Sequence, residues 1–321
     1  GRTTLGSAGD IIDIASLPNK RYYMVLENIL GDSGEVSPEI TFNGDTGTNY
    51  PIRRSNNGGT DWTSTTYNYM YNAYGGTISD RFIVGYIANQ SDKEKLYQHH
   101  QCINVNRSDA GTAPDRNELA SKWANTSDPI DQITVTNSGG GSFDTGAEVV
   151  VLGFDPADTH STNFWEELAD ISLTSTNTSL DSGTFTAKKY LWVQMYQKGM
   201  TGNNTLYNFN SDTGSNYARR WRIDGGTEWT TGSTTGLMCH NAVGTQTDNF
   251  FNMFIVNNSA NEKLVISSSV YTISTGAGSP PSREEHVGKW DNTSSQITSI
   301  QFDHGGSNFG IGSSIKVWGS D

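Results

Sequence analysis

The stretch Phe42–Thr63, FNGDTGTNYPIRRSNNGGTDWT, occurs a second time in the same chain and therefore governs how the whole sequence is interpreted. The second copy, Phe209–Thr230, has the sequence FNSDTGSNYARRWRIDGGTEWT and begins 167 residues later (209 − 42 = 167). Of the 22 aligned positions, 13 are identical. A repeat of this length indicates a duplicated module, and features found in both copies are those that the module requires.

A second repeated block supports the same division of the chain. AGTAPDRNELASKWANTS at Ala110–Ser127 aligns with AGSPPSREEHVGKWDNTS at Ala277–Ser294, and 10 of the 18 positions are identical. A chain of 321 residues is long enough for two domains of ordinary size. We therefore expect one domain over residues 1–155, a linker over 156–169 and a second domain over 170–321.

The composition favours short strands joined by many turns. Only 17% of the residues are charged, 35 are glycine, and 8 Trp, 14 Tyr and 12 Phe supply large side chains for a core. Strong β-branched and aromatic segments occur at equivalent places in the two copies, at 20–29 and 188–196. We expect about eight strands in each copy. The sequence thus predicts an all-β chain of two tandem antiparallel β-sandwiches of jelly-roll type.

One segment between the copies is a candidate helix. Pro156–Ala169, PADTHSTNFWEELA, offers Ser161 or Thr162 as an N-cap, with Glu166 and Glu167 early in the turn that follows. We expect a short helical linker there. At the offset of the repeat, residues 164–167 correspond to positions before residue 1, which suggests that the ancestral module was longer than the first copy.

Net charge and apolar runs limit the partners that we expect for this chain, and the cysteines indicate the state of its thiols. The net charge of −13 argues against nucleic acid, because phosphate binding needs a positive field. No apolar run approaches the roughly 20 residues that a membrane span needs, so we expect no membrane insertion. Cys102 and Cys239 lie at non-equivalent points of the copies and lack metal-ligand spacing, so we expect two free thiols.

Residues that could carry catalysis form no recognisable set. The common hydrolase, phosphate-binding and metal motifs are absent, and none of the six histidines is repeated in the other copy. The carboxylates shared by both copies have structural alternatives: Glu94 can pair with Lys95, and Arg116 with Glu118 can tie down a loop. We expect no enzymatic activity, and keep a glycoside hydrolase as the least favoured alternative, because it would need two of these carboxylates facing each other across a cleft: Asp45/Asp212, Asp80/Asp248, Glu94/Glu262 and Glu118/Glu285.

The repeated DTGxN segment admits two interpretations. Asp45 and Asn49, like Asp212 and Asn216, place side-chain oxygens around a glycine, as calcium loops do. The same residues are what a tight turn needs for its positive φ and its side-chain hydrogen bonds. We expect a structural turn, with a bound Ca²⁺ as the second hypothesis and no other cofactor.

The aromatic residues divide into a shared and an unshared group. Trp62/Trp229 and Trp123/Trp290 occur in both copies, and we expect them in the core, with sugar stacking as the alternative. The loop NYMYNAYGG belongs to the first copy alone, so we expect its tyrosines to form a surface contact: Tyr67, Tyr69, Tyr71 and Tyr74.

Four motifs together carry a resemblance to a known family. FNxDTGxNYxxR, GGTxW, AGxxPxRxExxxKWxNTS and the closing EVVVLGFD/IKVWGSD resemble repeated β-sandwich modules in virion proteins of tailed phages, especially marine and uncultured ones. The resemblance covers nearly all of both halves. It implies a decoration, tail-fibre or spike protein, or a subunit of a related self-assembling filament, often homotrimeric and without catalytic residues. A glycan-binding adhesin is the alternative.

Overall fold

The computed structural model describes residues 1–32, 34–71, 80–156, 158, 163–201, 204–240, 245–272 and 276–321. Across these ranges the chain is all-β, with four antiparallel sheets. None of the described segments is a helix that is long and apolar enough to cross a membrane. The chain divides into two compact units, residues 1–107 with 115–162 (unit 1) and residues 108–114 with 163–321 (unit 2). The change of unit after residue 162 falls within the expected linker.

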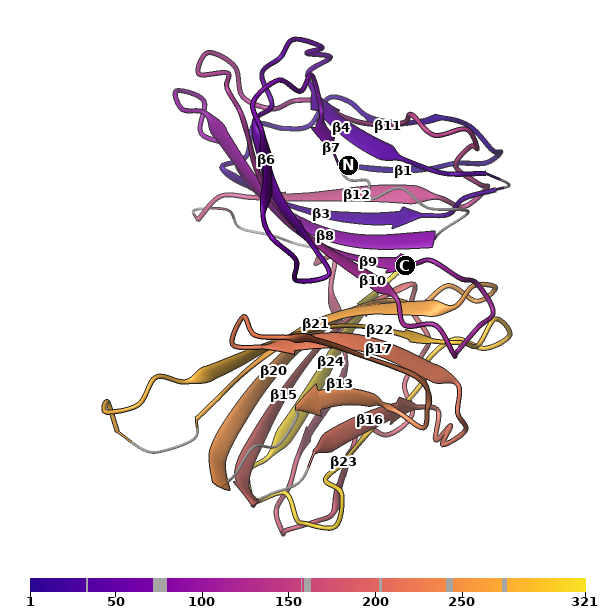
Figure 1. The fold of residues 1–321 in the computed structure, drawn as a ribbon, viewed down its shortest axis with the longest axis vertical. Coiled ribbons are helices and arrows are strands. Elements are labelled where there is room, and N and C mark those ends of the chain that lie inside the picture. Colours follow the sequence, from indigo (N-terminus) through magenta and orange to yellow (C-terminus); the bar gives the residue numbers. More distant parts are fainter. Residues whose placement is uncertain are drawn as a thin grey trace. The chain divides into compact units, whose positions relative to one another are not determined.

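Unit 1 contains an eight-stranded and a four-stranded sheet (Figure 1). Across the larger sheet the order is β1 (Arg2–Thr4), β12 (Glu148–Phe154), β3 (Tyr22–Ile29), β8 (Asp80–Ala88), β9 (Lys95–Asn104), β10 (Asp115–Trp123), β5 (Ile52–Asn56) and β6 (Trp62–Ser64). The smaller sheet has the order β2 (Ile11–Ile14), β11 (Ile133–Asn137), β4 (Pro38–Phe42) and β7 (Met70–Tyr71).

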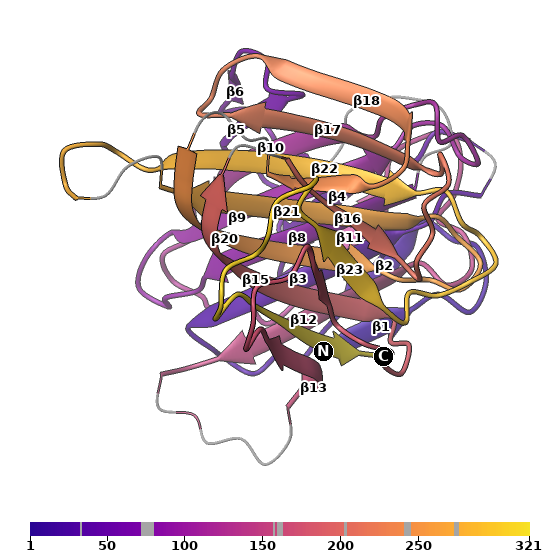
Figure 2. The same cartoon turned by 90° about the horizontal axis from the view of Figure 1, so that it is seen from below.

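Unit 2 has the same two sheets, and every position is taken by the strand twelve places later in the chain. Its larger sheet has the order β13 (Glu166–Ser172), β24 (Ser314–Ser320), β15 (Tyr190–Thr201), β20 (Thr245–Val256), β21 (Lys263–Tyr271), β22 (Ser282–Trp290), β17 (Tyr217–Ile223) and β18 (Glu228–Thr234). Figure 2 shows β17 between β18 and β22. The smaller sheet has the order β14 (Ser179–Asp181), β23 (Ile300–Asp303), β16 (Thr205–Phe209) and β19 (Leu237–His240).

Each unit has its own core, formed by side chains from both of its sheets. In unit 1, Val25 and Ile87 of the larger sheet belong to the same buried cluster as Ile40 and Val135 of the smaller one. Because side chains alternate along a strand, the neighbours of each core residue along its strand point to the opposite face of the sheet, away from this core. This arrangement confirms the β-sandwich character that the composition predicts. The free cysteines are also confirmed, since Cys102 and Cys239 are both buried and unbridged.

The prediction of a short helical linker is wrong. Within the described part of 156–169 there is no helix, and Glu166–Ser172 is strand β13, which pairs with β24. The edge strand β24 takes up backbone donors and acceptors of this segment. The aromatic pair Phe164 and Trp165, just before β13, packs on Tyr190 and Trp192. Together these interactions outweigh a weak local preference for helix. The count of about eight strands per copy is too low as well, because short edge strands such as β1 and β6 carry little signal.

Candidate binding surface

Asp45 is the centre of the repeated turn. Its Oδ1 accepts a hydrogen bond from the amide of Gly47 at 2.8 Å, and its Oδ2 accepts from the side-chain amide of Asn49 at 2.9 Å and from the indole N–H of Trp123 at 2.6 Å. Burial alone would raise the pKa of Asp45, but these three hydrogen bonds outweigh it and hold the pKa below its usual value. The carboxylate therefore joins the turn to strand β10.

Tyr50 closes the same turn from the other side. Its hydroxyl accepts from the amide of Phe42 at 3.0 Å and lies 3.1 Å from the carbonyl oxygen of Asp45, to which it can donate. The second copy repeats these contacts. Asp212 accepts from Gly214, Asn216 and Trp290 at 2.8, 2.9 and 2.7 Å, and the hydroxyl of Tyr217 accepts from Phe209 at 3.0 Å.

These contacts suit a structural turn and do not suit a cation. The structure brings Asp45 to Asn49 and Asp212 to Asn216, but N–H donors occupy the carboxylate oxygens, and each asparagine presents its NH₂ group, which is not a metal ligand. Among the described residues there is no group of three or more His, Cys, Asp or Glu side chains that could hold a metal. Calcium at this turn stays a prediction that the contacts do not support.

The expected tyrosine surface lies only partly within the described residues. Tyr67 is half-buried against the core of unit 1, 5.8 Å from the ring of Trp62 and 5.1 Å from that of Tyr69. Tyr74 and the side chain of Tyr71 lie outside the described residues. Tyr67 and Tyr69 thus belong to one aromatic cluster with Trp62.

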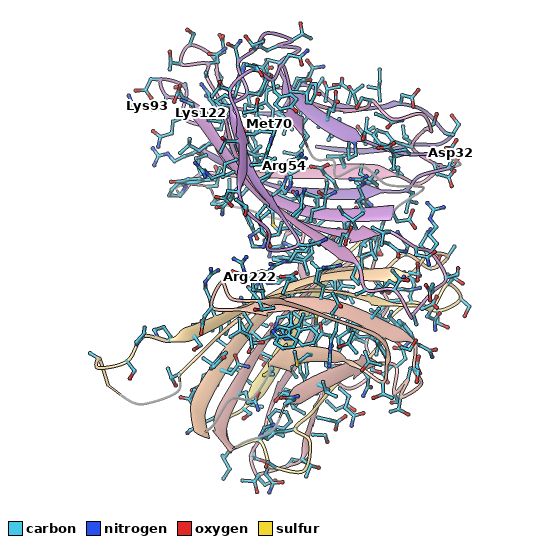
Figure 3. The ribbon with its side chains drawn as sticks, in the orientation of Figure 1. Asp32, Arg54, Met70, Lys93, Lys122 and Arg222 are labelled. Carbon is cyan, nitrogen blue, oxygen red and sulfur yellow. The ribbon has the colours of Figure 1, made fainter. Side chains whose placement is uncertain are left out.

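The repeated tryptophans do not share one environment. Trp123 and Trp290 are buried, which confirms the expectation for this pair, but Trp62 is 41% exposed and Trp229 is 54% exposed. The core prediction for the latter pair is wrong because both lie on edge strands, β6 and β18, which have a neighbour on one side only. The guanidinium of Arg54, labelled in Figure 3, lies 4.7 Å from the centre of the Trp62 ring.

The charge pairs are partly as expected. Arg116 and Glu118 form an ion pair of 3.0 Å, although within strand β10 and not around a loop. The pairing of Glu94 with Lys95 is wrong, because Glu94 pairs with Lys122 at 2.8 Å. The side chain of Lys95 instead points inward and is buried. Its ammonium group donates a hydrogen bond to the carbonyl oxygen of Asn125 at 2.9 Å.

Acid–base groups that the sequence did not single out lie inside the sandwiches. His286 Nε2 is 2.9 Å from a carboxylate oxygen of Glu284, and both side chains are buried. In unit 1, His99 Nε2 is 3.1 Å from Asn117, and burial lowers the pKa of His99 to about 4. The E-x-H spacing in a strand, which puts both residues on one face, is the signal that could have found the first pair. Burial makes them structural groups and not an accessible catalytic pair.

One recess among the described residues is a groove on the outer face of unit 1, meaning the face of the eight-stranded sheet turned away from the four-stranded one. It has a volume of about 440 Å³. Its outward-pointing side chains include Tyr86, Leu96 and Phe154, which are 42%, 58% and 48% exposed. The ring of Phe154 lies 5.4 Å from that of Tyr22. Gln98 adds a polar side chain, so the groove is apolar with a polar group on one side.

A second, charged recess continues from this outer-face groove. It has a volume of about 230 Å³ and shares Gln98 and Ala120 with the groove. Arg53 and Asp61 line it and form an ion pair of 3.0 Å. Sequence reasoning missed both recesses. The available signal was that large apolar residues such as Leu96 fall at positions where alternation predicts an outward side chain.

No family model and no curated protein matches this sequence. Among solved structures, the chain is similar to domains LG4-5 of the mouse laminin alpha1 chain at 9% identity and a TM-score of 0.20, with 99% of this chain and 88% of that chain covered. It also matches a Pseudomonas aeruginosa FadL homologue at 8% identity and a TM-score of 0.10, covering 95% and 91%. Likenesses this weak carry no argument about function.

Proposed function

We propose that this chain is a non-enzymatic virion structural protein, a capsid decoration or tail-fibre or spike component that docks on the particle and projects its β-sandwich units. The outer-face groove is the observation that carries this proposal. Exposed aromatic and aliphatic side chains on a sheet face are typical of contact surfaces in a protein that is otherwise polar and acidic. The resemblance of the repeated motifs to tailed-phage modules supports the proposal that the chain is part of a virion.

The finer architecture belongs to the same proposal. We infer two tandem jelly-roll-like sandwiches that arose by internal duplication. The identical strand order of the two units and the repeated turn around Asp45 and Asp212 support this history.

We also propose that the chain has no enzymatic activity, because of the side chains that line the groove. Its described lining is mainly Tyr, Phe, Leu and Ala, with Gln98 and Ser121, and a hydrolase would need an accessible acid or nucleophile there. The charged recess beside it is lined by two carboxylates, Asp61 and Glu118, which are already paired with Arg53 and Arg116. We expect no hydrolysis of polysaccharides by the purified chain, and steady release of reducing ends would overturn this part of the proposal.

The partners that we propose are further copies of this chain, in a trimer, and other virion proteins. We propose a virion or extracellular location, without membrane insertion and without nucleic acid, which the net charge of −13 disfavours. Sedimentation velocity tests the self-association. We expect a homo-oligomer that dissociates on dilution, and a monomer that persists up to about 100 μM would contradict this.

A glycan-binding adhesin is the second candidate, because sugars stack on aromatic rings flanked by amide groups. Tyr22 and Phe154, whose rings lie 5.4 Å apart, line the same groove as Gln98 and offer that combination. A glycan array read with the intact chain and with Phe154→Ala tests it. Binding that is lost in the variant supports an adhesin, and an array without signal removes it.

A further inference from the structure

Trp62 of β6 and Trp229 of β18 are a repeated pair that lies at the surface. The two residues occupy equivalent places in the two copies, and their side chains are 41% and 54% exposed. β6 and β18 are at the opposite edge of the larger sheet from β1 and β13. An indole contributes most to stability when it is buried, so its retention at an exposed place in both copies points to a role at the surface.

A planar group from the neighbouring strand supports each indole. Arg54 on β5 lies directly opposite Trp62, and its guanidinium group is 4.7 Å from the centre of the indole ring. Trp221 on β17 lies directly opposite Trp229, and the two rings stack at 6.5 Å with 20° between their planes. Since about half of each repeated tryptophan stays exposed, the face turned away from this support is open to solvent.

Hydroxyl groups accompany each stacking platform, meaning Trp62 or Trp229 with the residue that supports it. Ser64 and Thr231 come two residues after the tryptophans, and because side chains alternate along a strand, they lie on the same face as the indoles. Both are partly exposed. In unit 1 the ring of Tyr67 adds a second aromatic group, 5.8 Å from that of Trp62. An open indole face beside hydroxyl groups suits a sugar ring, which presents C–H groups to the aromatic face and hydroxyl groups at its rim.

The charges around the stacking platforms favour a neutral ligand. Arg53, the neighbour of Arg54, pairs with Asp61 at 3.0 Å. Its counterpart in unit 2, Arg220, donates from Nε to the carbonyl oxygen of Pro114 at 2.8 Å. A sulfated or carboxylated glycan would therefore meet arginines that already have partners, on a chain with a net charge of −13.

We propose that Trp62 and Trp229 are the stacking platforms of two equivalent binding sites for a neutral, pyranose-containing glycan, one in each unit. The sugar ring lies with its C–H face against the open indole face, and its hydroxyl groups reach Ser64 or Thr231. Neither tryptophan lines the outer-face groove, so the inference goes beyond the docking role proposed for that groove. One ring on one indole binds weakly, with a Kd on the order of 1 mM, and two sites on one chain raise the avidity for a polymeric glycan.

The test follows the indole N–H signals of the isotope-labelled full chain by NMR during titration with cellotetraose, maltotetraose and mannotetraose. The chain has 8 tryptophans, so these signals form a small set. We expect at least one of the sugars to shift the signals of Trp62 and Trp229, with that of Trp221 stacked on the latter, and to leave the others in place. Trp62→Ala and Trp229→Ala should each lose one of the two saturable responses, and the double variant should lose both. The unmoved signals show that each variant is folded.

Phe154→Ala is the matched control, because it removes an exposed aromatic ring of the groove and should leave both responses unchanged. Loss of both responses in this variant would place the sugar in the groove and overturn the stacking platforms. No shift up to about 20 mM of each sugar, or shifts caused by a heparin tetrasaccharide alone, would also overturn them. So would altered sedimentation of the double variant without sugar, which would make the tryptophans a subunit interface. The proposed function is judged separately, by whether the chain is found on virus particles.

Discussion

At the scale of single residues, the hydroxyl groups of Tyr50 and Tyr217 hold the repeated turn. Tyr50→Phe leaves the buried amide of Phe42 without its acceptor, and such a loss costs about 1–3 kcal/mol in free energy of unfolding. Tyr217→Phe should cost the same, because its contact with Phe209 has the same 3.0 Å length. Urea denaturation measures both. Tyr86→Phe is the control, since its exposed ring should change stability by less than about 0.5 kcal/mol.

Lys263 should make stability depend on pH in the alkaline range. Burial lowers the pKa of Lys263 from 10.5 to about 8, and Glu262 offsets this only in part. Between these two pH values the unfolded chain binds a proton that the folded chain has lost, so stability rises with pH, by at most about 1.4 kcal/mol per pH unit.

Lys263→Met should remove this slope, and Lys93→Met, at an exposed lysine, should keep it (Figure 3). Urea denaturation at several pH values from 8 to 10.5 measures the difference. Parallel curves for the wild type and Lys263→Met would show that the lysine does not titrate in this range.

Residue roles could be predicted where a residue pattern favours one local structure over its alternatives. Asp45 and Asn49 are drawn to a turn by their own side-chain hydrogen bonds, and the structure has both there. Trp62 could not be placed, because its exposure follows from lying on an edge strand, which depends on the order of the strands in the sheet. The pairing predicted for Lys95 was wrong for a related reason, since inward and outward positions are assigned only once the strand register is known.

At the scale of elements, the aromatic pair before β13 is the part of unit 2 with the clearest testable role. Trp165→Ala removes a half-buried ring from Trp192 and Phe254, so we expect unit 2 to lose about 2 kcal/mol in free energy of unfolding. Differential scanning calorimetry measures this loss. Trp62→Ala is the matched control and should cost much less, and equal losses would contradict the role given to Trp165.

Strands were predictable where hydrophobic alternation is long. The expected strand at 20–29 is β3, Tyr22–Ile29, and the expected strand at 188–196 lies largely within β15, Tyr190–Thr201. The helix over 156–169 failed because Glu166 and Glu167 favour a helix start locally, while the open edge of β24 offers this segment a full set of hydrogen bonds. That partner lies about 150 residues away and is invisible to local propensity.

At the scale of the whole molecule, the repeat was the most informative feature. It predicted two similar all-β halves, and the two units have the same strand order. The difference between the copies could not be predicted, because the groove of unit 1 depends on the pairing of β12 and on which outward side chains remain uncovered. The repeated parts account for the fold, and we place the function where the copies differ.

The claim that this chain is a virion component is tested most directly by locating it. Immunogold electron microscopy, with an antibody against this chain, should be applied to particles purified from cells that produce it. The account predicts gold at regular positions on the capsid, the tail or its fibres. Unlabelled particles, with all of the chain recovered in the soluble fraction, would contradict it.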